Sequence, residues 1–248
     1  MAKDLFSQQA EAYALYRPAY PEELFTYILS FVTKKEAAWD CATGNGQSAL
    51  PLSQYFKKVI ASDISKKQLE QAAKKDNIEY IVCSAEQTPF PNNSFDLITI
   101  SQAYHWLDWE EFYAEATRVG KENCVIAVWM YDLLFSNDAK LNELIIHFYK
   151  NVTGPYWDKE RQHIDDHYST VRFEFNPLPA KEFFSEKAFT KEQLFGYFST
   201  WSATQNFFKA NGKTPVEQVK DAFGHLWRPG EIKFFQFPIY LKLGRIIK

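Results

Sequence analysis

Short apolar runs alternate with segments of helical periodicity over the first half of the chain. The runs are almost continuously apolar, which is typical of strands that are buried on both faces of a parallel sheet. Between them, apolar residues recur at spacings of three and four, as on one face of a helix. The expected strands cover residues 37–41, 58–63, 80–83, 95–100 and 124–129, and the expected helices cover 21–31, 47–54, 65–75 and 109–119. Because parallel strands need crossover connections, this alternation predicts an α/β fold with helices on both faces of a mostly parallel sheet.

The rhythm breaks after Asp132, and segment 154–170 is polar and aromatic. We therefore expect residues 132–180 to be an insertion that forms a lid. The remaining expected elements are helices at 137–150, 190–199 and 214–225 and a final strand at 234–243. With no internal repeat or flexible linker in the sequence, we expect a single domain over residues 1–248, with its core at 36–131 and 180–248.

Composition narrows the choice of partners. The 28 basic and 31 acidic residues give a net charge of −3, and proteins that bind nucleic acid are usually basic. The N-terminus lacks the apolar stretch of a signal peptide, and no apolar window is long enough to span a membrane. We therefore expect a cytoplasmic protein, monomer or homodimer, that binds neither nucleic acid nor membrane. His163 and His167 could share a metal-ligand face, but no third ligand accompanies them, so we expect no metal site.

A glycine-rich turn follows the first expected strand, at Asp40-Cys41-Ala42-Thr43-Gly44-Asn45-Gly46. Glycines let a ligand approach the backbone closely, beside a helix N-terminus that attracts negative charge. Asp63 ends the second strand 17 residues later and could accept hydrogen bonds from both hydroxyls of a ribose, although it could also cap the next helix. Together these features predict an adenosine-containing ligand. Because Gly44, Gly46 and Ala49 fit the pattern G-x-G-x-x-A, a nicotinamide dinucleotide is one alternative.

The next segments carry a more specific pattern. Ser84-Ala85-Glu86 follows the third strand, residues 88–96 lead into the fourth, and that strand ends in Ser101-Gln102-Ala103-Tyr104-His105-Trp106. Together with D-x-x-x-G-x-G at residues 40–46 and S-D-I-S at residues 62–65, these segments resemble the class I S-adenosylmethionine-dependent methyltransferases. Upstream, the run Tyr13 to Pro21 resembles the Y-x-x-x-R-P-x-Y-P of the trans-aconitate methyltransferase subgroup, which acts on small molecules.

The resemblance implies a Rossmann-like, seven-stranded, mostly parallel sheet with a C-terminal antiparallel strand and an N-terminal helical flap. Tyr13, Tyr16 and Tyr20 are more aromatic surface than a free arm should expose, so we expect this flap to close over the cofactor. It implies methyl transfer from S-adenosylmethionine to a small molecule, with a carboxylate among the candidates. Two features depart from the pattern: Ala42 stands where the family has a glycine, and residues 120–123 replace a Pro-Gly-Gly loop. An NAD(P)-dependent oxidoreductase and a non-catalytic S-adenosylmethionine binder remain the alternatives.

Roles for individual residues follow from their places. Asp63 would hold the ribose, Ile64 and Ala85-Glu86 the adenine, and Asp40 with backbone groups at the turn and at the end of strand four the methionine portion. Arg17 could pair with a carboxylate of the cofactor or of the substrate. The expected cofactor-binding residues are Tyr13, Arg17, Asp40, Ala42, Gly44, Gly46, Asp63, Ile64, Ala85, Glu86 and Gln102. If the acceptor needs a base, His105 or Tyr20 is the catalytic candidate.

The acceptor pocket is expected to be apolar and aromatic with a few polar groups. Arg17, His105 and Arg172 are the polar candidates. Trp129, Tyr131, Trp157 and Trp201 could belong to the core, but their position near the insertion suggests that some of them line the pocket.

Overall fold

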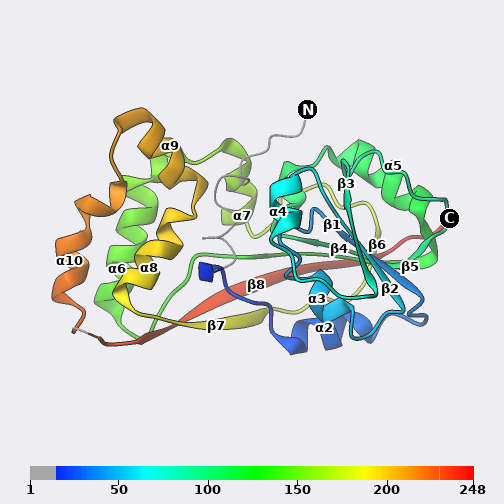
Figure 1. The fold of residues 1–248 in the computed structure, drawn as a ribbon, viewed down its shortest axis with the longest axis horizontal. Coiled ribbons are helices and arrows are strands. Elements are labelled where there is room, and N and C mark those ends of the chain that lie inside the picture. Colours follow the sequence, from blue (N-terminus) through cyan, green and yellow to red (C-terminus); the bar gives the residue numbers. More distant parts are fainter. Residues whose placement is uncertain (1–14, 229) are drawn as a thin grey trace.

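The computed structural model describes residues 15–228 and 230–248 of the chain, and Tyr13 lies outside these residues. Its centre is a twisted sheet with strand order β3-β2-β1-β4-β5-β8-β6, in which β7 also pairs with β8 (Figure 1). The strands are β1 (Ala37–Cys41), β2 (Lys58–Asp63), β3 (Ile78–Val82), β4 (Phe95–Ser101), β5 (Gly120–Tyr131), β6 (Asn176–Pro177), β7 (Phe183–Phe189) and β8 (Lys233–Arg245). Strands β1 to β5 are parallel, and β8 is antiparallel to β5. The predicted Rossmann-like sheet with a C-terminal antiparallel strand is confirmed.

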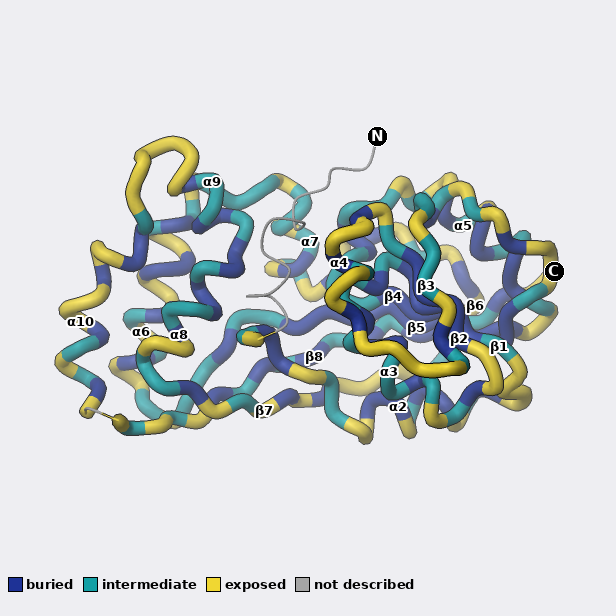
Figure 2. The backbone as a smooth tube through the Cα atoms, viewed as in Figure 1, coloured by how far each residue is buried: buried dark blue, intermediate teal, exposed yellow. Residues whose placement is uncertain are grey.

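Successive residues of the central strands face opposite sides of the sheet, and both sides are covered. Ala38 and Leu97 pack with α2 (Glu22–Leu29) and α3 (Ala49–Leu52), whereas Trp39 and Ile98 pack with α5 (Trp109–Val119). Figure 2 shows the resulting buried layer along the central strands. Coverage on both faces explains why these strands are continuously apolar in the sequence.

Capping side chains fix where two helices begin at the carboxyl edge of the sheet. Asp108 caps α5 by accepting hydrogen bonds from the amides of Glu110 and Glu111, both at 3.1 Å. Ser65 caps α4 (Lys66–Glu70) by accepting from the amide of Gln68 at 3.3 Å. Such caps satisfy amide groups that the first helical turn leaves without partners. The two helices therefore begin directly behind the loops that follow β2 and β4.

A group of helices lies at the end of the molecule away from the parallel sheet (Figure 1). It contains α6 (Ala139–His147), α8 (Lys191–Ser199), α9 (Ser202–Asn211) and α10 (Lys220–His225), with short helical turns at Phe148–Val152, Gly154–Tyr156 and Pro215–Gln218. Phe148, Phe198, Trp201 and Phe223 share its core. The first part of the expected lid at 132–180 thus packs with helices from residues 191–225, which the sequence predicted as part of the core. The later part packs elsewhere: Ile164, Tyr168 and Phe175 share a cluster with the central strands.

The chain segment ahead of α2 is held by strand β7 and by helix α8 of this group. Lys187 Nζ donates hydrogen bonds to the carbonyls of Leu15 and Arg17, at 2.9 and 2.7 Å. The ring of Tyr16 lies so close to Gly196 of α8 that a Cβ there would come within 2.4 Å of it. Residues 15–17 are therefore positioned by β7 and α8, which sets the place of the Arg17 side chain.

Candidate functional site

The carboxyl ends of β1, β2 and β4 meet at one edge of the sheet, where ligands bind in open α/β folds. The glycine-rich turn lies here. Gly44 and Gly46 have φ values of +57° and +82°, which glycine adopts without strain. A Cβ on Gly46 would lie 2.7 Å from the hydroxyl oxygen of Tyr80, so this position also lacks space for a side chain. Gly44 is less crowded: it is partly exposed, and an added Cβ would meet only Gln68 Oε1, at 3.9 Å.

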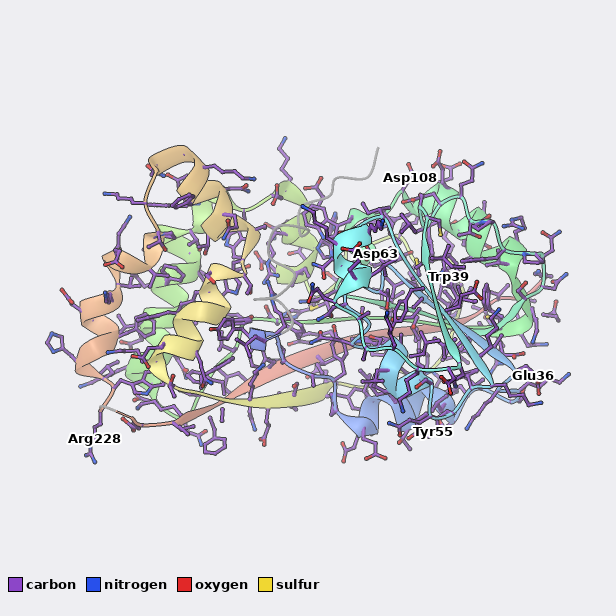
Figure 3. All side chains as sticks on the ribbon, in the orientation of Figure 1. Glu36, Trp39, Tyr55, Asp63, Asp108 and Arg228 are labelled. Carbon is purple, nitrogen blue, oxygen red and sulfur yellow. The ribbon has the colours of Figure 1, made fainter. Side chains whose placement is uncertain are left out.

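Asp63 joins the end of β2 to this turn. Its carboxylate accepts a hydrogen bond from the amide of Gly44 and another from the amide of Ser65, each at 2.8 Å. Figure 3 shows Asp63 beside the start of α4. Since Ser65 caps that helix, Asp63 is not its cap. Each carboxylate oxygen has a second lone pair, so Asp63 can hold the turn and also accept from ribose hydroxyls.

Asp40 is completely buried beneath the turn. Its carboxylate accepts hydrogen bonds from the hydroxyl of Thr99 at 2.7 Å and from the hydroxyl of Thr43. Burial raises the pKa of Asp40 to about 6, against the lowering effect of these hydrogen bonds. Asp40 therefore supports the turn from beneath, through its hydrogen bond with Thr43.

The loop after β3 forms another wall of this edge. Ile64 is 38% exposed, whereas Ala85 is buried. Glu86 accepts a hydrogen bond from the Ser84 hydroxyl and one from the amide of Asp108 at 3.2 Å. These contacts fix the apolar surface and the carboxylate that the sequence assigned to adenine.

Gln102 follows β4 with a φ of +56° and links it to β5. Its side-chain amide donates to the carbonyl of Tyr131 and accepts from the amide of the same residue, both at 3.0 Å. The side chain is thus used in joining the strand ends, as is the backbone amide of Gln102, which donates to the carbonyl of Trp129 at 2.9 Å.

A pocket adjoins this edge between β5 and the helical group; we call it the aromatic pocket. Its wall includes the rings of Tyr131, Trp157, Tyr197 and Trp201, and its polar lining includes Arg17, Gln102, His105 and Arg161. Of the four aromatic candidates from the sequence, three line this pocket, whereas Trp129 is fully buried in the core.

Arg17 is buried in the wall of the aromatic pocket. Its Nη1 donates to the hydroxyl of Tyr131 at 2.6 Å, and its Nη2 donates to the carbonyl of Thr200 at 2.8 Å. The guanidinium also lies over the ring of Tyr197, 5.3 Å from its centroid. Arg17 thus joins the end of β5 to α8. Tyr20 packs edge-on against Trp129, with ring centroids 5.4 Å apart.

His105 is buried at the end of β4, with its Nδ1 at 2.8 Å from the hydroxyl of Tyr168. Tyr168 and the preceding His167 both have positive φ, +57° and +51°, an uncommon conformation for non-glycine residues. Burial lowers the pKa of His105 well below its usual range, and the positive charge of Arg161 lowers it further. The imidazole is therefore neutral at pH 7 and a weak base.

Three candidate residues, Arg172, His163 and His167, have other partners than the sequence suggested. Arg172, expected as a pocket residue, is outside the aromatic pocket: it is half-exposed and pairs with Glu174 at 2.8 Å. His163 and His167 have separate partners, Thr170 at 2.8 Å and Asp132 at 3.0 Å. Within residues 15–228 and 230–248, no group of three or more acidic, histidine or cysteine side chains is arranged to hold a metal, and no helix could cross a membrane. Sequence reasoning missed Arg161 and Tyr197, which only the folded helical group brings to the pocket.

Ala42 adopts the left-handed conformation, with a φ of +51°, at the position where the resembled family has glycine. We expect Ala42→Gly to raise the free energy of unfolding by about 0.5–1 kcal/mol, because the left-handed strain of alanine exceeds the entropy that glycine costs. Urea unfolding measures this difference. Ala114→Gly, in the exposed middle of α5, is the control and should destabilise; a less stable Ala42→Gly variant would contradict the assignment of strain.

Comparison with known proteins places this geometry among methyltransferases. A family profile described as methyltransferase domain matches residues 39–128. A Dictyostelium discoideum relative, named provisionally as a methyltransferase, is 34% identical over 250 residues, 98% of this chain and 95% of the relative. A Saccharomyces cerevisiae relative, named provisionally as an S-adenosylmethionine-dependent methyltransferase, is 28% identical over 46% of this chain and 43% of its own length. A solved Anaeromyxobacter dehalogenans structure, titled provisionally as a type II methyltransferase, has a TM-score of 0.85 and 31% identity over 94% of this chain and 99% of that chain.

Proposed function

Because the chain belongs to the class I S-adenosylmethionine-dependent methyltransferases, with S-adenosylmethionine as cofactor, we propose that it methylates a small molecule bound in the aromatic pocket. Family membership replaces the two alternatives that the sequence left open, the oxidoreductase and the non-catalytic binder. The observation that carries the small-molecule proposal is the position of the aromatic pocket, walled by rings and adjoining the edge where Asp63 and the glycine-rich turn lie.

The residues at the sheet edge fit the parts of the cofactor. Asp63 would accept from the ribose hydroxyls, and Ile64 with Ala85 would cover the adenine. The partly exposed turn at Gly44 and the charge of Asp40 would serve the methionine portion, whose ammonium and sulfonium are cationic. When bound, the cofactor supplies a methyl group on an activated sulfonium. The chain's own residues need mainly to align the acceptor and exclude water.

A carboxylate is the acceptor class that suits the pocket best. Phenols and carbon acids must lose a proton before they attack, which calls for a base with a pKa near the working pH. His105 is a weak base at pH 7, because burial lowers its pKa. A carboxylate is already ionised and attacks without a base. The sequence resemblance to trans-aconitate methyltransferase adds support to this choice.

The proposal is tested by incubating the protein and labelled S-adenosylmethionine with a panel of small carboxylic acids and a matched panel of phenols. We expect labelled methyl esters from the carboxylic acids, recognised by their mass and by loss of label in mild base. Base-stable methyl ethers from the phenols alone would contradict the carboxylate assignment, and no transfer to either panel would contradict the small-molecule proposal.

A further inference from the structure

The guanidinium of Arg161 lies where two hollows of the surface meet. One is the aromatic pocket, and the other is a groove of about 750 Å³ between the end of β5 and the segment 146–165. Both are lined by Asp132, Leu133, Trp157 and Arg161. The Arg161 side chain is therefore part of the boundary that the groove and the aromatic pocket share.

One side of the Arg161 guanidinium is held by the protein. Its Nε donates to the hydroxyl of Tyr149 at 2.8 Å and lies 3.7 Å from a carboxylate oxygen of Asp165. The guanidinium also stands over the rings of Trp157 and Tyr149, at 4.9 and 5.4 Å from their centroids. With only 17% of its side chain exposed, Arg161 is oriented before any ligand arrives.

The other side of the guanidinium is available to a ligand. Among the described residues, the hydrogen bonds of Arg161 involve Nε alone, so both terminal nitrogens keep their donors. The neighbouring carboxylate of Asp132 is engaged by His167 Nε2 at 3.0 Å and by the amide of Leu133 at 2.6 Å. Arg17 differs, because its two terminal nitrogens donate to Tyr131 and Thr200.

We propose that Arg161, rather than Arg17, binds an anionic group of the methyl acceptor and so selects carboxylic acids. The planar fork of a guanidinium matches a carboxylate in bidentate geometry, and a mostly buried cation attracts an anion more strongly than an exposed one. The ring of His105, with its Nδ1 engaged by Tyr168, leaves Nε2 as a further polar atom in the same wall. This inference rests on the proposed function and identifies the residue that determines acceptor specificity.

The test compares phenylacetate with its neutral analogue phenylacetamide, by ligand-observed nuclear magnetic resonance titration in the presence of S-adenosylhomocysteine. We expect the wild-type protein to bind the carboxylate at least about tenfold more tightly, the scale of one hydrogen bond to a charged group. Arg161→Gln should abolish this preference, and Arg161→Lys should keep part of it, since the charge remains but the fork is lost. Arg172→Gln, in the same segment but outside the pocket, should keep the wild-type preference.

Equal binding of the two compounds by the wild-type protein would overturn the inference, as would a full carboxylate preference in Arg161→Gln. If Arg161→Gln shows no cooperative unfolding transition, it is not folded and Arg161→Lys becomes the test. A carboxylate preference as large in Arg161→Lys as in the wild-type protein would then overturn the inference. Failure of the proposed function gives a different result. Carboxylate binding without methyl transfer contradicts the function alone, whereas transfer to neutral acceptors without carboxylate preference contradicts the role of Arg161 alone.

Discussion

Replacing Asp63 with alanine is expected to weaken binding of S-adenosylhomocysteine by roughly 10- to 150-fold, the equivalent of about 1.5–3 kcal/mol for hydrogen bonds to a charged group. The carboxylate would lose its bonds to the ribose and also its hold on the amides of Gly44 and Ser65. Both losses act on the cofactor site. Calorimetric titration measures the affinity directly.

The Asp63 experiment has two controls. Asp76→Ala removes an exposed carboxylate near the start of β3 and should leave the affinity unchanged. Asp63→Asn keeps one acceptor oxygen and should lose less affinity than alanine. If Asp63→Ala binds S-adenosylhomocysteine as tightly as the wild-type protein does, the ribose is held elsewhere and the assignment is wrong.

The second large effect concerns pH and Asp40. Burial raises the pKa of this carboxyl from 3.8 to about 6, so it is charged at pH 8 and protonated at pH 5. Because its negative charge favours the cationic groups of S-adenosylmethionine, we expect affinity to fall by up to about tenfold per pH unit below pH 6. Asp40→Asn should bind weakly at every pH and remove this dependence. A wild-type affinity that is constant from pH 5 to 8 would contradict the role of Asp40.

The free energy of unfolding should change with pH in the opposite direction to the cofactor affinity. The folded protein binds the Asp40 proton more tightly than the unfolded chain does, so this group makes folding less favourable as pH rises from 3.8 to about 6. At pH 8 the charged carboxyl therefore destabilises the fold by an amount on the order of 1–3 kcal/mol. Asp40→Asn should unfold at a higher urea concentration than the wild-type protein at pH 8, even though it binds the cofactor poorly.

The parallel sheet was predictable because strands covered on both faces leave long apolar runs in the sequence. Strand β7 was missed because its exposed face interrupts the pattern: Phe183, Ser185 and Phe189 are buried, whereas Phe184 and Glu186 are exposed. Helix α9 was missed because it follows α8 after only two residues. These elements depend on the partners they pack against, which local pattern does not reveal.

The cofactor edge was easier to predict from the sequence than the aromatic pocket. The residues assigned to the cofactor edge come from strand ends within about one third of the chain, where the topology alone brings them together. The pocket combines Arg17 and Tyr131, which were candidates from the sequence, with Arg161 and Tyr197, which only the packing of distant helical segments brings to it. Arg172 was assigned to the pocket wrongly, because its sequence position near the lid does not show that its side chain pairs with Glu174 on the surface.

The most direct measurement of the central claim is the fate of a labelled methyl group in a fractionated cell extract. The wild-type protein and Asp63→Ala are each given labelled S-adenosylmethionine with separated small-molecule, transfer RNA and protein fractions. Methyl transfer to a molecule held in the aromatic pocket predicts that label enters the small-molecule fraction and that Asp63→Ala greatly reduces it at limiting cofactor. Robust labelling confined to the transfer RNA or protein fraction would contradict that account.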